Sequence, residues 1–143
     1  MVDVFSKTKR SKVMSRIRSR NTLPELELRR ALHKVGYRFR LHVKTLAGKP
    51  DIVLAAYRCA IQVRGCFWHG HDCIDGHIPK SHGEYWKPKL ARNKRNDRRN
   101  DRIMRKEGWA VAIVWECRTK TRASLERQVK RISRILEGRR PSE

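Results

Sequence analysis

The spacing of apolar residues predicts a helix in the first third of the chain. Over residues 22–36, three apolar side chains recur at helical spacing: Leu28, Leu32 and Val35. Thr22 is placed to cap this helix with Glu25 as its capping-box partner, and Pro24 suits the first turn. Gly36 is expected to end the helix in the left-handed conformation.

Two further helices are expected in the second half of the chain. A strongly basic helix runs from Lys89 to Glu107 and stops at Gly108. The last helix is amphipathic and ends at Gly138, and its apolar face is formed by Leu125, Val129, Ile132 and Leu136. Residues 74–88 contain several glycines and prolines and are expected to be irregular.

Four β-like runs complete the pattern: Tyr37–Val43, Asp51–Tyr57, Cys59–Val63 and Trp109–Trp115. Gly48-Lys49-Pro50 interrupts the β pattern before the second run, and Tyr57-Arg58 is expected to form a tight turn before the third. This arrangement favours a hairpin or adjacent strands. The fourth run is apolar throughout and is therefore expected to be a central strand, buried on both faces.

These elements predict an α/β fold in which helices flank a small mixed central sheet. At 143 residues, the chain is expected to hold one folded domain over residues 21–143. Residues 1–20 carry seven Lys or Arg and one acid, with Val13, Met14 and Ile17 at helical spacing. They are either a basic arm or helix that becomes ordered on DNA, or a solvated terminus.

Composition points to a polyanionic partner. Lys and Arg total 36 against 14 Asp and Glu, a formal net charge of +22, and clustered positive charge is neutralised most effectively by nucleic acid. A ribosomal or histone-like protein would have the same composition. No apolar run reaches the ~18 residues of a membrane span, and the N-terminus lacks the apolar stretch of a signal peptide. A cytoplasmic protein, associated with the bacterial nucleoid, is expected.

Four residues have the side chains of a structural zinc site: Cys66, His71, Cys73 and Cys117. The first three lie within one short segment, and the fourth follows the apolar strand. Three thiolates and an imidazole are a typical tetrahedral zinc set, although unrelated thiols and a surface histidine would look the same. Cys59 is the poorer candidate, because it can be buried as a small apolar residue.

A second pattern concerns carboxylates. Pro50-Asp51 begins one strand and Gln62-Val63-Arg64 ends the next, which is the outline of the PD-(D/E)XK nuclease core. Two adjacent strand ends can hold a carboxylate and a carbonyl around Mg²⁺, which polarises a phosphate and acidifies a bound water. By itself this outline is weak.

Aromatic residues and a histidine lie in or near residues 66–73, the predicted zinc loop. Phe67 and Trp68 lie within it and Trp86 precedes the basic helix, so all three are candidates for a wedge between base pairs, or alternatively for core residues. His69 lies between zinc candidates, on the opposite side of an alternating backbone. It is a candidate general base, although a lone histidine is more often a satisfied polar group.

Three long motifs carry a resemblance to a known family: GCFWHGHDC at 65–73, RNKRNDRRN at 92–100 and GWAVAIVWEC at 108–117. With them, nearly the whole chain resembles the very-short-patch repair (Vsr) DNA mismatch endonucleases of the PD-(D/E)XK superfamily. The resemblance implies a restriction-endonuclease-like fold with a structural zinc and a DNA-nicking activity that uses Mg²⁺. It implies cleavage 5′ to the thymine of a T:G mismatch, which begins very short patch repair of deaminated 5-methylcytosine.

The resemblance also assigns roles to residues. It implies metal binding by Asp51 and by the backbone carbonyl of Val63, where some relatives carry Thr. It implies that His69 acts on the hydrolytic water, and that Glu25 and Asp97 support this water and the metal. The implied zinc ligands are Cys66, His71, Cys73 and Cys117, and the implied DNA-wedging residues are Phe67, Trp68, Trp86, Met14 and Ile17.

The chain departs from the family pattern at Arg64, where relatives hold His or Asp, so the charge near the metal differs. The expected partners are double-stranded DNA with a T:G mismatch and, functionally, a companion cytosine-5 DNA methyltransferase. A monomer is the expected state. The alternative is a zinc-stapled mismatch-binding module without catalysis.

Overall fold

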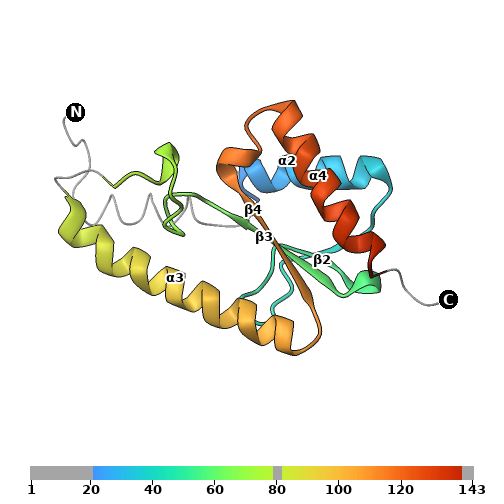
Figure 1. Cartoon of the computed structure of the whole chain (residues 1–143), viewed down its shortest axis with the longest axis horizontal. Helices are drawn as coiled ribbons and strands as arrows, with labels where there is room; N and C mark the ends of the chain where they lie inside the picture. Colours follow the sequence, from blue (N-terminus) through green and yellow to red (C-terminus); the bar gives the residue numbers. More distant parts are fainter. Residues whose placement is uncertain (1–20, 79–81, 140–143) are drawn as a thin grey trace.

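The structure, a computed structural model, describes residues 21–78 and 82–139 (Figure 1). Its helices are α2 (Leu23–Val35), α3 (Gly83–Lys106) and α4 (Arg122–Glu137). Its strands are β1 (Arg40–Leu41), β2 (Ile52–Leu54), β3 (Cys59–Arg64) and β4 (Ala110–Trp115). Short 3₁₀ turns span Ala55–Tyr57, Ile74–Gly76 and Glu116–Arg118. The expected α/β fold, a small mixed sheet flanked by helices, is confirmed.

The four strands form one sheet in the order β1-β2-β3-β4. β1 and β2 pair antiparallel, β2 and β3 pair antiparallel, and β3 and β4 pair parallel, with Val63 opposite Val114. A parallel pair needs a long crossover, and α3 provides it. The crossover places the ends of β3 and β4 side by side, so the residues that follow the two strands share one edge of the sheet.

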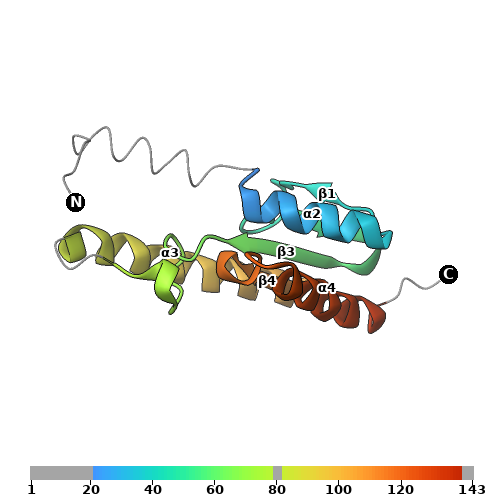
Figure 2. The ribbon, with the colours of Figure 1, turned by 90° about the horizontal axis from the view of Figure 1, so that it is seen from above.

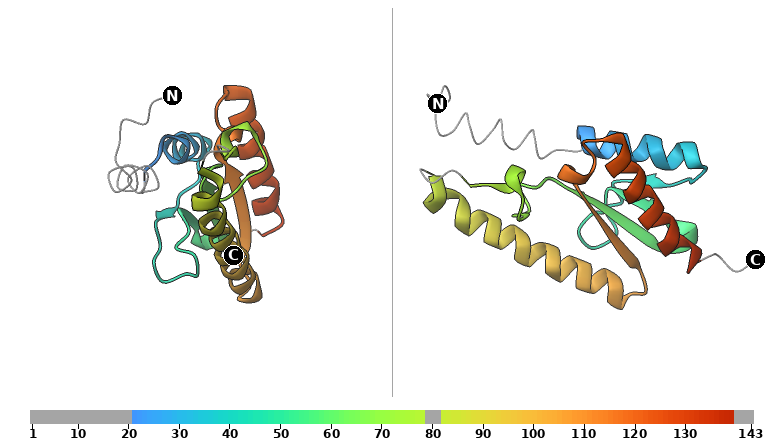
Figure 3. Two further views of the ribbon diagram at one scale, coloured as in Figure 1. Left: turned by 90° about the vertical axis from the view of Figure 1, so that its left-hand side faces the viewer. Right: turned by 45° about the horizontal axis from the view of Figure 1, so that its top comes forward.

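Helices α2 and α4 pack together against one face of the sheet, as Figures 1 and 2 show. Leu28 and Leu32 of α2 and Ile132 of α4 are fully buried there against Ile61 and Val114 of the sheet. Helix α3 runs along the other side of β3 and β4 (Figure 3). Side chains alternate along a strand, so β3 presents its odd-numbered residues to α2 and α4 and its even-numbered ones to α3. Within the described residues, no helix is long and apolar enough to cross a membrane.

The strands are shorter than the pattern predicted. The Tyr37–Val43 run contains only two strand residues, because the backbone turns into the left-handed region at His42, with φ of 47°. The Asp51–Tyr57 run ends in a 3₁₀ turn after Leu54. The predicted turn at Tyr57-Arg58 is confirmed, with Arg58 in the left-handed region at φ of 49°.

The predicted place of the fourth strand was wrong. β4 lies at an edge of the sheet, next to β3, and is only partly buried at alternate positions. Its uniform apolar character has another cause, because α3 and α4 both contact it. A helix on each face favours apolar side chains on both sides of an edge strand as well as of a central one.

The start of α3 and one residue of the α2 apolar face also differ from the prediction. α3 begins at Gly83, six residues before the predicted start, and includes Pro88. Trp86 is buried in this first part, and its burial offsets the hydrogen bond that the proline removes. The end of α2 at left-handed Gly36 is confirmed, but Val35 is 60% exposed and not part of the apolar face. The end of α4 before Gly138 is as predicted.

Candidate active site and metal cluster

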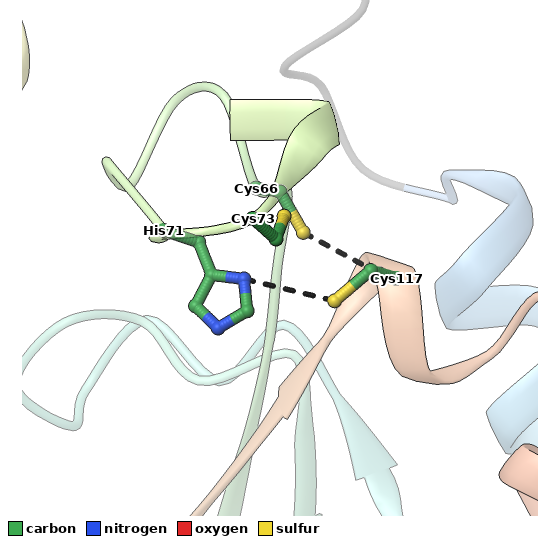
Figure 4. A group of neighbouring side chains, drawn as sticks. All are labelled: Cys66, His71, Cys73 and Cys117. Atoms are coloured by element: carbon green, nitrogen blue, oxygen red, sulfur yellow. Dashed lines mark hydrogen bonds between the residues drawn. The ribbon is translucent and has the colours of Figure 1, made fainter. Parts of the chain in front are cut away.

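The four predicted zinc ligands form one cluster, drawn in Figure 4. Their ligand atoms all lie within 4.8 Å of one another. Cys66, His71 and Cys73 come from the loop after β3, and Cys117 from the 3₁₀ turn after β4. The parallel pairing of β3 and β4 is therefore what joins the local three-residue set to the distant fourth residue. The cluster has the donors and closed arrangement of a structural zinc site.

The surroundings hold this cluster in place. The Cys117 N–H donates to the Cys66 sulfur at 3.4 Å, and the Cys117 sulfur lies 3.6 Å from His71 Nδ1. The His71 ring stacks on Trp115, with ring centres 4.1 Å apart. Burial raises the pKa of the Cys66 thiol to about 12, so binding of a soft cation must displace a proton from that sulfur.

Cys59 lies outside the cluster, as the sequence predicted. It is fully buried in β3, and burial raises the pKa of its thiol to about 11, although Arg139 nearby acts in the opposite direction. It therefore behaves as a small apolar core residue.

The loop that carries the cluster is built of tight turns. The N–H of His71 donates to the carbonyl of Cys66 at 2.8 Å, and the N–H of His69 donates to the carbonyl of Gly65 at 3.2 Å. The expectation of an alternating backbone around His69 was therefore wrong. His69 contacts Asp97 of α3 instead of joining the cluster, and the chain turns directly after it at Gly70, which has φ of 63°.

A second cluster forms where β2 begins. Ligand atoms of Glu25, His42 and Asp51 all lie within 4.8 Å of one another. Asp51 Oδ2 accepts the N–H of Val63 at 2.8 Å, which ties the start of β2 to the end of β3. Glu25 is 2% exposed, and both of its carboxylate oxygens lie 3.0–3.1 Å from His42 Nε2.

Glu25 does not act as the predicted capping-box residue. Thr22 makes no side-chain cap hydrogen bond, and the Glu25 carboxylate turns inward, where it pairs with Arg29 as well as with His42. A buried carboxylate needs such partners, and the predicted cap would have left it on the surface. Its place beside Asp51 agrees with the supporting role that the family resemblance implies, which stays a prediction.

Electrostatics at Asp51 favour a bound cation. Burial raises the pKa of its carboxyl from 3.8 to about 6, against the Val63 hydrogen bond, which lowers it. The charge of Glu25 raises the pKa further and His42 lowers it. Two close carboxylates with hard oxygen donors fit Mg²⁺ chemically, because a divalent cation removes their mutual repulsion.

His42 belongs to this cluster and was missed in the sequence. Its position in an alternating run marks it only as a polar strand residue. The contact depends on the left-handed backbone at His42 and on a neighbour 17 residues earlier in α2, and neither follows from a local pattern.

A third group joins β3, the zinc loop and α3. His69 Nδ1 lies 2.6 Å from Asp97 Oδ2, and the catalytic roles of both residues stay predictions. Arg64 is 6% exposed, donates from Nη2 to both oxygens of Asp101 at 2.7 and 2.9 Å, and has its Nε 3.9 Å from Asp97 Oδ2. Asp101 was not singled out in the sequence, although it follows Asp97 by one helical turn. Two consecutive residues of β3 thus connect this group to the Glu25–His42–Asp51 cluster. The Val63 N–H donates to Asp51, and the Arg64 side chain faces Asp97.

The predicted DNA-wedging aromatics form one packed group. Ring centres of Phe67, Trp68 and Trp86 lie 5.0–5.5 Å apart with edge-to-face geometry, and Tyr85 joins them beside Trp86. Trp86 is 4% exposed, whereas the other two predicted residues are partly exposed. Their wedge role stays a prediction. Met14 and Ile17 lie outside the described residues.

Clustered carboxylates at a strand end, beside a histidine–aspartate pair on a strongly basic α/β chain, are typical of hydrolases that cut nucleic-acid backbones. The sequence model of the family described as DNA mismatch endonuclease Vsr matches residues 2–75. The chain belongs to the Vsr DNA mismatch endonuclease family, and homology makes it a DNA nicking endonuclease with DNA as its substrate.

Curated relatives cover almost the whole chain. The type II nicking enzyme V.XorIIP of Xanthomonas oryzae pv. oryzae is 46% identical over 132 residues, 92% of this chain and 97% of its own length. The type II nicking enzyme V.NmeAIP of Neisseria meningitidis serogroup A is 42% identical over 137 residues, 96% of this chain and 98% of its own. The DNA mismatch endonuclease Vsr of Escherichia coli is 41% identical over 125 residues, 87% of this chain and 80% of its own.

Proposed function

We propose that this chain nicks one strand of duplex DNA at a T:G mismatch, on the 5′ side of the mismatched thymine. The reaction would begin very short patch repair of deaminated 5-methylcytosine, with the companion cytosine-5 methyltransferase defining the sequence context. The observation that carries the proposal is the connection from Asp51 through Val63 and Arg64 to Asp97 and His69. A relative named as a mismatch endonuclease, 41% identical to the chain, supports it.

Asp51 and the Val63 carbonyl would hold Mg²⁺, with Glu25 supporting the site from α2. When bound, this cation would supply charge to polarise the scissile phosphate. The carboxylates of Asp51 and Glu25 and a backbone carbonyl are oxygen donors, the ligand type that Mg²⁺ takes in proteins. The hydrogen bond from Val63 to Asp51 keeps the carboxylate directed at the end of β3.

His69 would act on the attacking water. Its Nδ1 faces Asp97, so Nδ1 carries the proton in the neutral ring and Nε2 is the nitrogen that accepts one from water. The Asp97 carboxylate would orient the ring and stabilise the imidazolium that forms. Both residues are held by rigid neighbours, because His69 lies in the turn-rich loop and Asp97 on a long helix.

The Cys₃His cluster would hold a structural Zn²⁺ that fixes the loop carrying Phe67, Trp68 and His69. The two partly exposed rings would open the mismatched step, with buried Trp86 supporting them from below. Unstacking costs least where pairing is already weak, so such a wedge favours a mismatch. Met14 and Ile17 would contact the DNA from the N-terminal segment.

The test uses three end-labelled duplexes with the same flanks that differ only at one pair, T:G, T:A or C:G, incubated with Mg²⁺. The expected result is a nick in the T:G duplex alone, 5′ to the thymine. Equal cutting of all three would remove the mismatch claim, and binding without scission under any divalent cation would favour a binding module.

Variants of the same protein test the assigned residues. Asp51→Ala and His69→Gln should reduce nicking strongly, whereas His33→Gln, an exposed histidine on α2, is the matched control and should not. Undiminished nicking by Asp51→Ala would remove the assigned centre.

A further inference from the structure

Arg64 lies within the connection between Asp51 and His69, but the proposed function gives it no role of its own. It is the last residue of β3 and is 6% exposed, so a full positive charge is almost removed from water. Its Nη2 donates to both carboxylate oxygens of Asp101, at 2.7 and 2.9 Å. A pair of opposite charges with hydrogen bonds to both oxygens is the arrangement that makes such burial tolerable.

The same guanidinium also faces Asp97. Arg64 Nε lies 3.9 Å from Asp97 Oδ2, the oxygen that contacts His69 Nδ1 at 2.6 Å. Asp97 and Asp101 are four residues apart in α3 and therefore lie on one face of the helix. Arg64 stands between these two carboxylates, binds one tightly and attracts the other.

This arrangement restrains a side chain that is otherwise free to rotate. The Asp97 side chain is 21% exposed, and His69 and Arg64 both approach the same oxygen, Oδ2. Without a positive charge beside it, Asp97 would be repelled by Asp101 and would gain water by turning outward from α3. With Arg64 fixed by Asp101, the carboxylate is attracted to the position from which it contacts the imidazole.

We propose that Arg64 is a positioning residue of the nicking reaction. It holds the Asp97 carboxylate against His69 and so keeps the Nδ1 proton on the side of Asp97 and Nε2 on the side of the DNA. The inference rests on the proposed function of His69. Arg64 is buried against Asp97 and Asp101, and it acts through Asp97.

The variant must remove the guanidinium without leaving a buried charge. Arg64→Gln alone would leave the buried Asp101 carboxylate without its positive partner, so a loss of nicking could reflect misfolding. Arg64→Met combined with Asp101→Leu replaces the ion pair by apolar side chains of similar size, an exchange that buried pairs often tolerate. The matched control is Arg131→Met on α4, which removes one exposed positive charge remote from the site.

The first measurement is single-turnover nicking of the T:G duplex. For the Arg64/Asp101 variant we expect a maximal rate roughly 10- to 100-fold lower, with little change in the enzyme concentration that gives half-maximal rate. Asp97→Asn should show a similar loss. Adding Asp97→Asn to the Arg64/Asp101 variant should slow it little further, because both changes remove the same contact. A wild-type rate in the Arg64/Asp101 variant, or losses that multiply, would overturn the proposal.

The second measurement does not depend on nicking. In protein labelled with ¹⁵N-histidine, the His69 Nδ1 proton should give a low-field NMR signal that disappears in Asp97→Asn. The same signal should shift or disappear in the Arg64/Asp101 variant and remain in Arg131→Met. An unchanged signal in the Arg64/Asp101 variant would overturn the positioning role. A wild-type protein that nicks no duplex would instead overturn the proposed function, and the signal would then decide only whether Arg64 holds Asp97 against His69.

Discussion

Asp51→Asn should stabilise the protein while it abolishes nicking. The carboxyl of Asp51 is largely buried, and burial raises its pKa from 3.8 to about 6. At neutral pH and without a cation, the folded chain therefore holds an ionised group that burial and Glu25 disfavour. The amide of asparagine is neutral and can still accept the hydrogen bond from the Val63 N–H.

The size of the effect follows from the pKa. A change of one in pKa corresponds to about 1.4 kcal/mol, so a rise from 3.8 to about 6 corresponds to about 3 kcal/mol of unfolding free energy. The folded state binds this proton more tightly than the unfolded state, so stability falls as pH rises between 3.8 and about 6. Above about pH 6 the full loss of unfolding free energy is present, and below pH 3.8 it is absent. Asp51→Asn should gain up to about 3 kcal/mol at pH 8 and progressively less as pH falls toward 4.

Urea unfolding of wild type and variant at pH 8 and pH 4.5 measures this difference, in buffer without Mg²⁺ but with zinc retained. Glu126→Gln, an exposed acid on α4, is the control and should behave like wild type at both pH values. Added Mg²⁺ should raise the midpoint of wild type alone, because binding to the folded state stabilises it. A variant less stable than wild type at pH 8, or an equal difference at both pH values, would refute the reasoning.

The remaining predictions concern the Cys₃His cluster, and each is tested by measuring the zinc content of the purified protein. Gly76→Ala should lower zinc content, because the added Cβ would lie 2.0 Å from the carbonyl oxygen of His71. Gly83→Ala has its nearest neighbouring atom at 3.5 Å and should retain zinc. Full zinc content in Gly76→Ala would contradict the close approach. Cys117→Ser should bind zinc substoichiometrically and Cys59→Ala should bind it fully, and equal zinc in both variants would contradict the ligand assignment.

The Cys₃His cluster could be predicted from the sequence because its signal is chemical. Three of the four ligands are close in sequence, and few other roles require thiols and imidazole together. The fourth, Cys117, could be named because it follows an apolar strand, and it reaches the others through parallel pairing of that strand with β3. An error in placing the strand at the centre of the sheet did not affect this result, since only the pairing matters.

The buried polar contacts could not be predicted in the same way. Glu25 has the spacing of a capping-box residue, and the local pattern gives no sign that the carboxylate turns inward toward His42 and Asp51. The pairing of Arg64 with Asp101 joins residues 37 positions apart. Such contacts depend on how α2 and α3 lie against the sheet, which local periodicity does not determine.

One face of α3 contacts both the loop after β3, which carries three residues of the Cys₃His cluster, and Arg64 at the end of β3. Asn93, Asp97 and Asp101 recur every four residues along an otherwise strongly basic helix and are buried or half-buried, whereas the residues between them are exposed except Asn100. Asn93 donates to the Trp68 carbonyl at 2.9 Å, Asp97 contacts His69, and Asp101 binds Arg64. In the sequence this stretch looks like a solvated charged helix, but its amide and acidic positions form a stripe that binds the loop at two points and the end of β3 at the third. The loop after β3 is therefore held by two sets of contacts, those of the Cys₃His cluster and those of α3. His69 lies in this loop, and its contact with Asp97 belongs to the second set.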